Sequence, residues 1–491
     1  MMRPRTVALS FAMLLLPAAS CVSNTVAVPS HNARTTPSAS TPIAASSSAA
    51  ASQLQPPAVP LRDLRLPSIA QRRTVGGLDV WHVDDPSVPI VHLRLVVDAG
   101  SSEDGAKSGL AKLTAMSLVH GAGASAGEGK VSPLLVDRMR VEVTRDAAIF
   151  SFDVLDRELH DALMVLGAMT SHPAFRQIDG DAAKREFVAQ VTSHARAPLA
   201  EVVRDAAVGQ GEAVSPDAKA IAGIDVQSFY RTHYGSKRAR LIVVGKAELD
   251  KVVQEAEAAF GAWAGPAPRA AEEPASPSRR LVLLDTPVGV EERSAWGAAL
   301  TPGFDDPAWP AIWLAAAIAA TEAHLATGES FGQSPVPLVS TGRPALLLIG
   351  GNATAENQAK MAENFTASLQ RLATAPPSND TMLAARKLLL DAIAVRTHSQ
   401  EALAATLTAI AQTGASPAFL GEVSAKLRAV SPTEVTAAVR SLLGPERWTL
   451  VFVGPAQELR APLGKFGSWS ERPLPGAPPS ASVPLPDLPP R

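Results

Sequence analysis

Apolar residues along the chain follow two periodicities that alternate through most of its length. Short runs rich in β-branched residues predict strands, and longer stretches with apolar residues three and four positions apart predict amphipathic helices. Because the two kinds of run are interleaved, we expect an α+β fold in which helices cover one face of each sheet. The expected strands are Leu78–Val83, Val91–Val97, Ala147–Val154, Arg240–Gly245, Ala345–Gly351 and Trp448–Gly454, and the expected helices include Glu158–Thr170, Ala182–Ala195 and Thr381–His398, the last with Asn379 and Asp380 as candidate caps.

The helix–turn–strand pattern that ends the first half of the chain recurs at the end of the second half. Gly245 and Gly454 each close an apolar strand and are 209 positions apart, and the same interval separates Gly235 from Gly444. The two strands are followed by FGAW and FGSW. A shared register without a gap predicts a duplicated domain.

Three segments have compositions that do not support a packed core. Residues 22–60 are mostly Ser, Ala, Thr and Pro, and two further Pro-rich stretches interrupt and end the folded part. The predicted order is a signal peptide at 1–20, a disordered tether at 21–62, an N-terminal domain at 63–264, a linker at 265–279, a C-terminal domain at 280–468 and a Pro-rich tail at 469–491. Each domain is expected to be a mostly antiparallel sheet covered by helices.

The first residues have the features of a secretory signal. A charged start, MMRPR, precedes an apolar stretch that is too short to cross a bilayer comfortably. The single cysteine, Cys21, ends this stretch, and Ala18, Ala19 and Ser20 before it resemble a bacterial lipobox, although Ala18 stands where Leu is usual. The resemblance implies a lipid anchor at Cys21 and, with Val22 next, an outer-membrane, periplasm-facing location. An ordinary cleaved signal is the alternative.

Charge and composition exclude several classes of function. The formal net charge is -2 and no Lys/Arg cluster occurs, so we expect no nucleic-acid binding. One cysteine excludes an intramolecular disulfide. No two of the ten histidines stand three or four positions apart, and no G-x-S-x-G occurs. Neither a histidine pair on a helix nor a serine nucleophile is therefore visible.

Several segments together resemble the M16 metallopeptidases, the family of pitrilysin, insulin-degrading enzyme and the mitochondrial processing peptidases. They are a strand followed by Ala99-Gly100-Ser101 and a helix opening Gly109-Leu110-Ala111, the segment DRELHDALMVLGAMTSHPAF, and the ending IDVQSFYRTHYGSKRARLIVVG. The duplication fits too, since each chain of that family holds two related domains. The resemblance spans most of residues 65–465 and implies two tandem M16-type domains.

In active members of that family, the helix that opens Gly-Leu-Ala carries H-x-x-E-H, whose two histidines bind zinc while the glutamate activates water. In this chain, Lys112 and Met116 stand at the histidine positions and Ala115 at the glutamate position. A protonated lysine has no lone pair, a thioether is a poor zinc ligand, and alanine cannot move a proton. We therefore expect no zinc cofactor and no catalytic residues, with Leu110, Leu113 and Met116 as core.

The family's third zinc ligand is a glutamate on a later helix. The closest correspondence here is Gln190, and a shift by one turn would make it Glu186. A single carboxylate does not make a zinc site. A further hypothesis is that the Lys112 ammonium replaces part of the missing metal charge by pairing with a carboxylate, so that Lys112→Met would lower stability.

The second domain offers another comparison with the family. Subunits without the zinc motif often supply an Arg and a Tyr from a segment like L-R-E-x-x-G-x-x-Y to hold the substrate backbone. Here Glu329 and Gly332 fit, but Gly328 stands at the Arg and Pro335 near the Tyr. The stretch resembles the family's chamber loop without its hydrogen-bonding side chains.

The resemblance leads to one main expectation about function. In the family, two such chains, or two halves of a long chain, close around a peptide, so we expect a non-catalytic subunit that pairs with an active zinc-containing M16 partner or with itself. A stand-alone peptide-binding or scaffold lipoprotein is the first alternative, favoured by the missing Arg and Tyr. Residual zinc metalloendopeptidase activity is the second.

Overall fold

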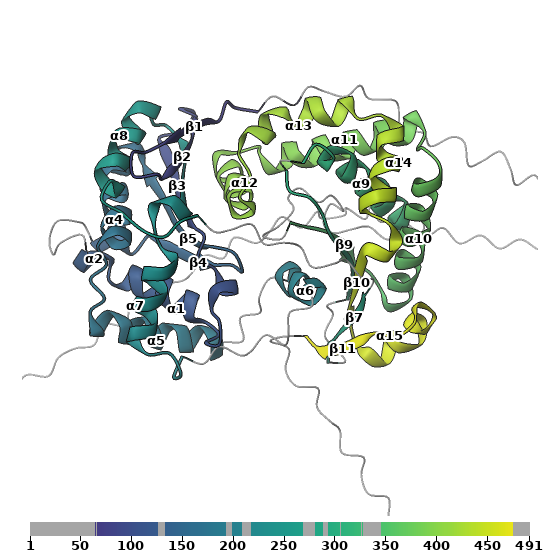
Figure 1. The fold of residues 1–491 in the computed structure, drawn as a ribbon, viewed down its shortest axis with the longest axis horizontal. Helices are drawn as coiled ribbons and strands as arrows, with labels where there is room; N and C mark the ends of the chain where they lie inside the picture. The colour runs from purple at the N-terminus through teal and green to yellow at the C-terminus, as the bar shows by residue number, and fades with distance from the viewer. Residues whose placement is uncertain are drawn as a thin grey trace, which may run out of the picture. The chain divides into compact units, whose positions relative to one another are not determined.

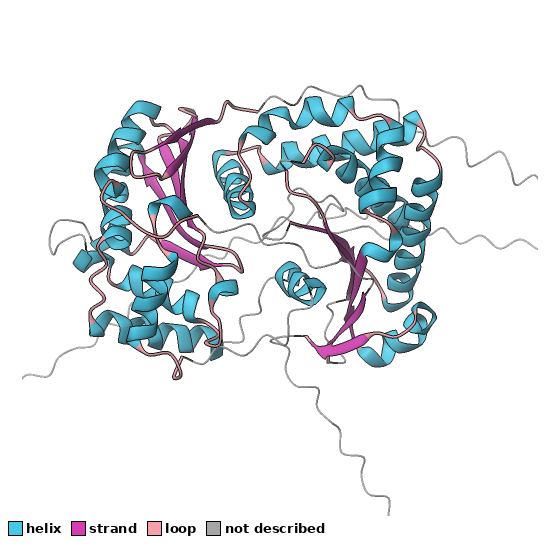
Figure 2. Cartoon of the chain, in the orientation of Figure 1, coloured by secondary structure: helices cyan, strands magenta, loops and turns pink. Residues whose placement is uncertain are grey.

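The apolar runs of the N-terminal half form a six-stranded sheet, the first sheet, in the computed structural model (Figures 1 and 2). Its strand order is β1-β2-β6-β3-β5-β4, and every neighbouring pair is antiparallel except the parallel pair β2–β6. The expected, mostly antiparallel α+β architecture is thus confirmed for this half. The strands are β1 (Ala70–Arg73), β2 (Asp79–Asp84), β3 (Ile90–Val97), β4 (Arg140–Val143), β5 (Ala148–Leu155) and β6 (Ala239–Gly245).

The structure describes residues 64–474 except 65, 126–132, 193–198, 209–217, 269–279, 288–292, 305, 326 and 328–344. These described residues belong to one compact unit of the chain. The expected signal peptide, Cys21 and the tether lie outside them, as do most of the linker, residues 475–491 of the tail and the expected chamber-loop residues Gly328, Glu329, Gly332 and Pro335. Within the described ranges, no helix is both long and apolar enough to cross a bilayer.

Helices of the N-terminal half pack on the outer face of the first sheet, on the left in Figure 1. Leu93, Leu95 and Phe150 point to this side and are completely buried in one apolar core with side chains of the helices. The helices are α1 (Leu110–His120), α2 (Ala122–Ser125), α3 (Pro133–Val136), α4 (Leu159–Ser171), α5 (Gln177–Thr192), α7 (Gly223–His233) and α8 (Leu249–Phe260). Leu110, Leu113 and Met116 lie in this core, as their spacing predicts.

The C-terminal half repeats the plan with a five-stranded second sheet in the order β11-β7-β10-β8-β9. Its first two pairs are parallel and its last two antiparallel, so it is mixed rather than mostly antiparallel. Residues 470–473, which composition places in the tail, form the edge strand β11, where proline is tolerated because it needs no ladder donor. The strands are β7 (Arg280–Asp285), β8 (Ser294–Leu300), β9 (Leu346–Asn352), β10 (Trp448–Gly454) and β11 (Ser470–Pro473).

Helices of the C-terminal half cover the outer face of the second sheet. The helix α11 is capped by Ser378, whose side chain accepts from the Thr381 N–H, so the expected caps Asn379 and Asp380 lie inside its first turn instead. The helices of this half are α9 (Trp309–Leu325), α10 (Ala355–Thr374), α11 (Asn379–Arg396), α12 (Gln400–Thr413), α13 (Ala418–Ala429), α14 (Pro432–Leu442) and α15 (Ala456–Leu463).

The inner face of each sheet is covered by a helix from the other half of the chain, so helices lie on both faces rather than on one. The helix α12 of the C-terminal half packs on β3 and β6 (Figure 1). At its two ends, Gln400 donates a hydrogen bond to the Asp85 carbonyl and Gln412 accepts one from the Thr144 hydroxyl. In return, α6 (Leu199–Val208) of the N-terminal half packs on β7, β8, β9 and β10. Its Val203 is completely buried against Val451 of the second sheet.

The two related glycines occupy equivalent places in the two sheets. Gly245 ends β6 with φ 135° and Gly454 ends β10 with φ 154°, in the region of backbone conformation that favours glycine. A Cβ atom at Gly245 would lie 2.1 Å from the Ile90 carbonyl oxygen. The repeat seen in the sequence is therefore a structural repeat, with each glycine closing a central strand.

Charged side chains also join α6 to the turn between β4 and β5. The Arg204 guanidinium lies 2.7 Å from the Asp146 carboxylate, and both side chains are almost completely buried. On the same helix, burial raises the pKa of Glu201 to about 7, and the nearby carboxylates of Glu142 and Asp205 raise it further than Arg204 lowers it. The docked helix therefore holds a proton near neutral pH that an exposed glutamate would have released.

The stability of the protein should depend on pH because the Glu201 carboxyl binds this proton more tightly in the folded state. Because the folded pKa of Glu201 lies above its ordinary value of 4.5, its ionisation opposes folding as pH rises from about 5 through 7. Replacing it by the neutral Glu201→Gln should stabilise the protein by roughly 1–3 kcal/mol at pH 8 and hardly at all at pH 5. Thermal unfolding at pH 5, 6, 7 and 8 measures this, with Glu248→Gln at an exposed position as the control for losing one charge. If the stability difference between Glu201→Gln and the unmodified protein does not increase from pH 5 to pH 8, the raised pKa of Glu201 is contradicted.

Candidate functional site

The helix α1, which the sequence resemblance aligns with the zinc helix of the M16 family, begins at a fixed turn. Gly109 precedes it with φ 90°, and the Asp104 carboxylate accepts hydrogen bonds from the backbone N–H groups of Gly109 and Ala111, both at 2.7 Å. These bonds satisfy donors that a helix leaves free at its N-terminus. Burial nevertheless raises the pKa of Asp104. The turn therefore sets where α1 starts and which of its faces meets the core.

The three positions that would carry the zinc chemistry face the protein interior. Ala115 is completely buried and Met116 is 2% exposed, and both belong to the apolar core of the N-terminal half. Lys112 is half-buried, with its ammonium 6.0 Å from the centre of the Phe187 ring on α5. None of these side chains offers zinc a favourable donor. The residues present therefore do not fit the zinc ion that the fold family implies.

The surviving carboxylate, Glu186, lies on the side of α5 that faces α1. Its Oε2 atom is 2.7 Å from Nε2 of His120, and Gln190 donates to its Oε1 at 3.0 Å. Both residues considered for the third zinc ligand, Gln190 and Glu186, thus meet in one hydrogen-bonded group. His120 was missed as a partner from the sequence, although it follows Lys112 and Met116 at intervals of four on one helical face.

Lys112 interacts with Glu186 in a different way from the ion pair expected from the sequence. Among the described carboxylates, none forms an ion pair within 4.0 Å of the Lys112 ammonium. Burial lowers the pKa of Lys112, and the negative charge of Glu186 offsets this only in part. The cost of desolvating the ammonium therefore exceeds the attraction it gains in the folded state.

The edge of the first sheet lies beside α1. The strand β4 packs against α1 and pairs with β5 on one side, and it is the last strand in the sheet order. Its Arg140 and Glu142 are exposed, while Val141 and Val143 pack against the apolar core. An edge strand leaves backbone N–H and C=O groups free to pair with another strand.

A cluster of ionic side chains lies at the Arg140 end of β4. The Asp153 carboxylate on β5 interacts with Nδ1 of His92 at 2.7 Å and accepts a hydrogen bond from Arg94 at 2.9 Å, and Arg140 also donates to it. Burial alone would raise the pKa of Asp153, but hydrogen bonding from His92 and the charges of Arg94 and Arg140 hold it well below its usual range. The carboxylate is thus ionised and shared between two guanidinium groups.

A groove of about 440 Å³ opens between α1 and the starts of α5 and α7. Leu113 and Ser117 line it from α1, but Lys112, Ala115 and Met116 do not, so it is separate from the emptied metal position. The Arg176 and Asp179 side chains at its wall are 2.8 Å apart and neutralise each other. The groove shows no concentrated charge that would recognise a particular ligand.

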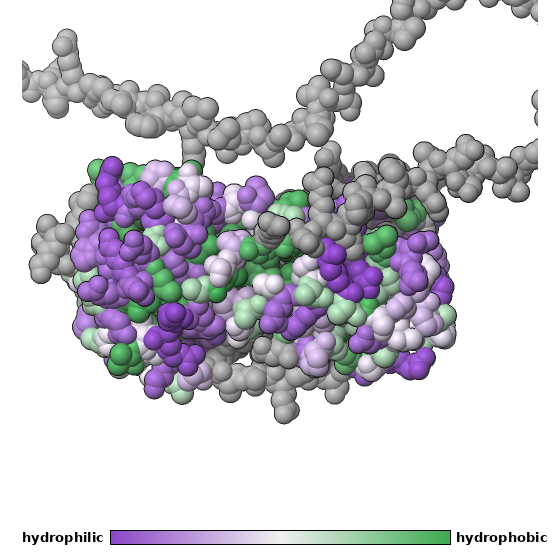
Figure 3. Space-filling view, turned by 90° about the horizontal axis from the view of Figure 1, so that it is seen from above, coloured by the Kyte–Doolittle hydropathy of each residue, from purple (hydrophilic) through white to green (hydrophobic). Residues whose placement is uncertain are grey.

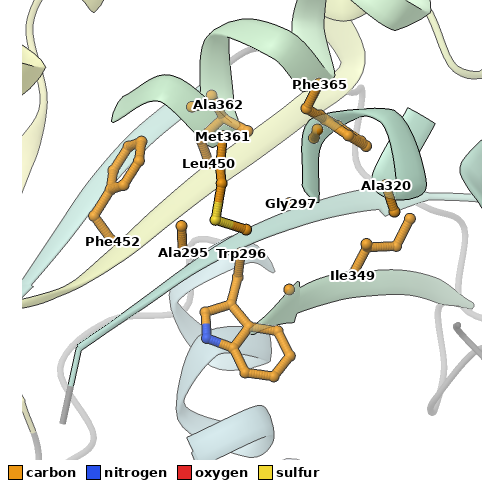
Figure 4. Close-up of a pocket in the computed structure, with 12 residues that line it drawn as sticks. Ala295, Trp296, Gly297, Ala320, Ile349, Met361, Ala362, Phe365, Leu450 and Phe452 are labelled. Carbon is orange, nitrogen blue, oxygen red and sulfur yellow. The ribbon is translucent and has the colours of Figure 1, made fainter. Parts of the chain in front are cut away.

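A cavity of about 40 Å³ lies inside the C-terminal half, between the second sheet and helices α9 and α10 (Figure 4). Its walls are apolar and include Trp296, Met361, Phe365 and Phe452. A space of this size holds little more than one water molecule, which would find no polar partners there. We interpret it as a packing defect rather than a ligand site.

Within the described ranges, no group of three or more His, Cys, Asp or Glu side chains is placed to hold a metal ion. Hydrophilic residues predominate over the N-terminal half in the face that Figure 3 shows. The region of α1 thus combines the buried apolar side chains of Ala115 and Met116, the hydrogen-bonded carboxylate of Glu186 and the edge strand β4.

Replacing Lys112 tests whether its charge stabilises this region. Because burial lowers the pKa of Lys112, removing the ammonium in Lys112→Met should raise the free energy of unfolding by up to about 1 kcal/mol, the opposite sign to the expectation from sequence. Lys251→Met on the exposed side of α8 is the matched control and should change little. Thermal unfolding measures both variants. A loss of stability in Lys112→Met would instead show that the ammonium balances the pocket.

Comparison with known proteins gives a family-model match over part of the chain and a fold. Residues 224–389 match the family model described as the peptidase M16 inactive domain, and this match runs from α7 into α11. No curated protein matches the chain. The matched region begins after α1, so it does not include Lys112, Ala115 and Met116.

Solved structures show the same fold. The peptidase M16 inactive domain from Pseudomonas fluorescens is 21% identical, with a TM-score of 0.62 over 83% of this chain and 100% of that one. The first half of the periplasmic protease PqqL from Escherichia coli is 12% identical, with a TM-score of 0.60 over 82% and 95%. A chain of complex III2 from Candida albicans is 15% identical, with a TM-score of 0.63 over 80% and 97%. The chain therefore has the fold of tandem M16-type domains, and its residues 224–389 match the model of the peptidase M16 inactive domain.

Proposed function

We propose that this protein is a non-catalytic M16 subunit that is lipid-anchored in the cell envelope and pairs with a zinc-containing M16 peptidase to bind peptides. It supplies one half of the peptide-binding chamber, and the partner supplies the metal. The similarity in fold to the first half of the periplasmic protease PqqL, over 95% of that half, supports this role. The lipid anchor at Cys21 and the outer-membrane location rest on the sequence of the N-terminal segment.

The observation that carries the proposal is the packing of α1. Ala115 and Met116 occupy, as buried apolar side chains, the positions where active relatives place a glutamate and a histidine. Restoring metal chemistry would require burying polar groups in this core, which is costly unless they are fully hydrogen-bonded or metal-bound. The helix therefore serves stability in this chain, and hydrolysis falls to the partner.

Peptide binding is supported by the neighbouring edge strand. The strand β4 lies next to α1 and has a free edge among the described strands, and its Arg140 and Glu142 side chains are exposed. An extended peptide can add to such an edge through main-chain hydrogen bonds. The chain thus keeps a surface for an extended peptide without the groups that would cleave it.

A stand-alone peptide-binding or scaffold lipoprotein is the second candidate. The observation that favours it is the composition of the expected chamber loop, where Gly328 and Pro335 stand in place of the Arg and Tyr that help non-catalytic subunits hold substrate. In that case the protein would act without a peptidase partner. The two candidates differ in what co-purifies with the full chain.

Metal analysis tests the absence of a zinc site. The purified chain, dialysed against zinc at neutral pH and then passed through a desalting column, should retain far less than one zinc per chain, because the described His, Cys, Asp and Glu side chains form no group of three that could hold the ion. It should also leave unstructured peptides uncleaved. One tightly bound zinc per chain, together with peptidase activity that a chelator abolishes, would support the residual metalloendopeptidase instead.

Affinity capture tests the partner. When the full chain is isolated from native envelope membranes after mild cross-linking, a protein with an intact H-x-x-E-H motif should be recovered in a one-to-one ratio, as expected for two halves of one chamber. Mass spectrometry identifies the motif and intensity-based quantification gives the ratio. Recovery of the chain alone, or only of copies of itself, would favour the scaffold or the self-paired form.

A further inference from the structure

The exposed face of β4 carries two opposite charges in a fixed order. Arg140 and Glu142 are two positions apart, so both side chains point to the same face of the strand. Both are exposed, whereas Val141 and Val143 between and after them face the apolar core. An added strand would place alternate side chains directly opposite these two charges, at a distance where opposite charges attract and like charges repel.

The surroundings strengthen the positive character at the Arg140 end. Arg94 is 7% exposed and, with Arg140, shares the single carboxylate of Asp153. His92 also contacts this carboxylate and adds no negative charge. Two guanidinium groups and one carboxylate leave an excess of positive charge where an incoming side chain would meet Arg140.

The surroundings strengthen the negative character at the Glu142 end. Burial is the largest cause of the raised pKa of Glu201 on α6, and the negative charge of Glu142 is the next largest. The carboxylates of Asp205 and Asp146 also raise this pKa. Their positive partners in this group are Arg204, which pairs with Asp146, and Arg145, which lies 4.0 Å from Asp205. Among these described side chains, carboxylates outnumber guanidinium groups, and a basic side chain would relieve their repulsion.

We propose that β4 selects a peptide strand with an acidic residue opposite Arg140 and a basic residue two positions away, opposite Glu142. This inference rests on the peptide-binding role proposed above and adds its specificity. An antiparallel strand, which continues the pairing of β3, β5 and β4, then carries the order basic, apolar, acidic from its N-terminus. The residue between the two charges faces the same side as Val141 and is apolar.

Two fluorescein-labelled peptides that differ only in charge order test this selectivity. The peptide Thr-Val-Lys-Val-Glu-Val-Thr-NH2, labelled with fluorescein on its N-terminal amine, should bind the full chain roughly tenfold more tightly than its partner with Glu and Lys exchanged, as measured by fluorescence anisotropy. Since the side chains are exposed, the preference should shrink as salt rises from 0.05 to about 0.5 M. Competition with the unlabelled peptides confirms that the label does not contribute.

The charge-swap variant Arg140→Glu/Glu142→Arg supplies the decisive comparison, because it should invert the preference while keeping the net charge. The swap Glu356→Lys/Lys360→Glu on α10, an exposed pair with its atoms 2.7 Å apart, is the matched control and should leave the preference intact. Single variants Arg140→Gln and Glu142→Gln, which introduce no new charge, should each reduce the preference and cover the case in which the double swap does not fold.

The outcomes separate this inference from the proposed function. Equal affinity for the two peptides, or a preference that the swap does not alter, would overturn the charge selectivity while leaving peptide binding in place. A reversed preference that inverts with the swap supports the charge pairing and assigns a parallel strand. Binding of neither peptide, nor of a random heptapeptide pool, would overturn peptide binding and the selectivity together.

Discussion

The exchange of helices α6 and α12 between the two halves is the constraint on which the structure depends. Each sheet has two apolar faces, and an apolar face left in water forgoes about 25 cal/mol for every Å² that could be buried. Neither half covers its own inner face: α12 lies on β3 and β6, and α6 lies on the second sheet. The two halves are therefore parts of one folding unit, although each has the sheet and outer helices of a separate domain.

This packing also explains how α1 can contribute to the stability of the fold without a bound metal. The helix contacts α5 and α7 on the outer side of the first sheet, so side chains at its inward positions contribute to a close-packed core. Ala115 and Met116 fill their positions without polar groups, and Glu186 finds partners in His120 and Gln190. What remains beside the helix is the charged edge of β4, the surface on which we propose peptide binding.

The sequence was informative where a pattern had a local cause. The apolar runs, the paired glycines Gly245 and Gly454, and the core side of α1 were all predicted, because strand alternation, backbone conformation and helical spacing act within a few residues. The covering of both sheet faces was not, although β10 is buried along its whole length and such runs indicate two covered faces. The helix responsible, α6, belongs to the other half of the chain and carries no local sign of its destination.

Long-range electrostatics explain the remaining differences. Sequence reasoning gave Lys112 an ion-pair partner because a lost metal charge suggests compensation, whereas in the folded chain burial outweighs the attraction of Glu186. The charged groups at the two ends of β4 likewise join residues from β3, β5 and α6 that lie far apart in the sequence. Their meeting depends on strand register and on the docking of α6, neither of which can be read from spacing.

The crossing of α6 also has a consequence for the order in which the protein can fold during synthesis. The helix ends at Val208, whereas the first strand of the sheet it covers begins at Arg280 and the central strand β10 ends at Gly454. While the ribosome makes the intervening chain, the apolar side of α6 has no sheet to bind, and the inner face of the first sheet waits for α12. Such late, non-local pairing slows folding and leaves apolar surface open to chaperones until nearly the whole chain has emerged.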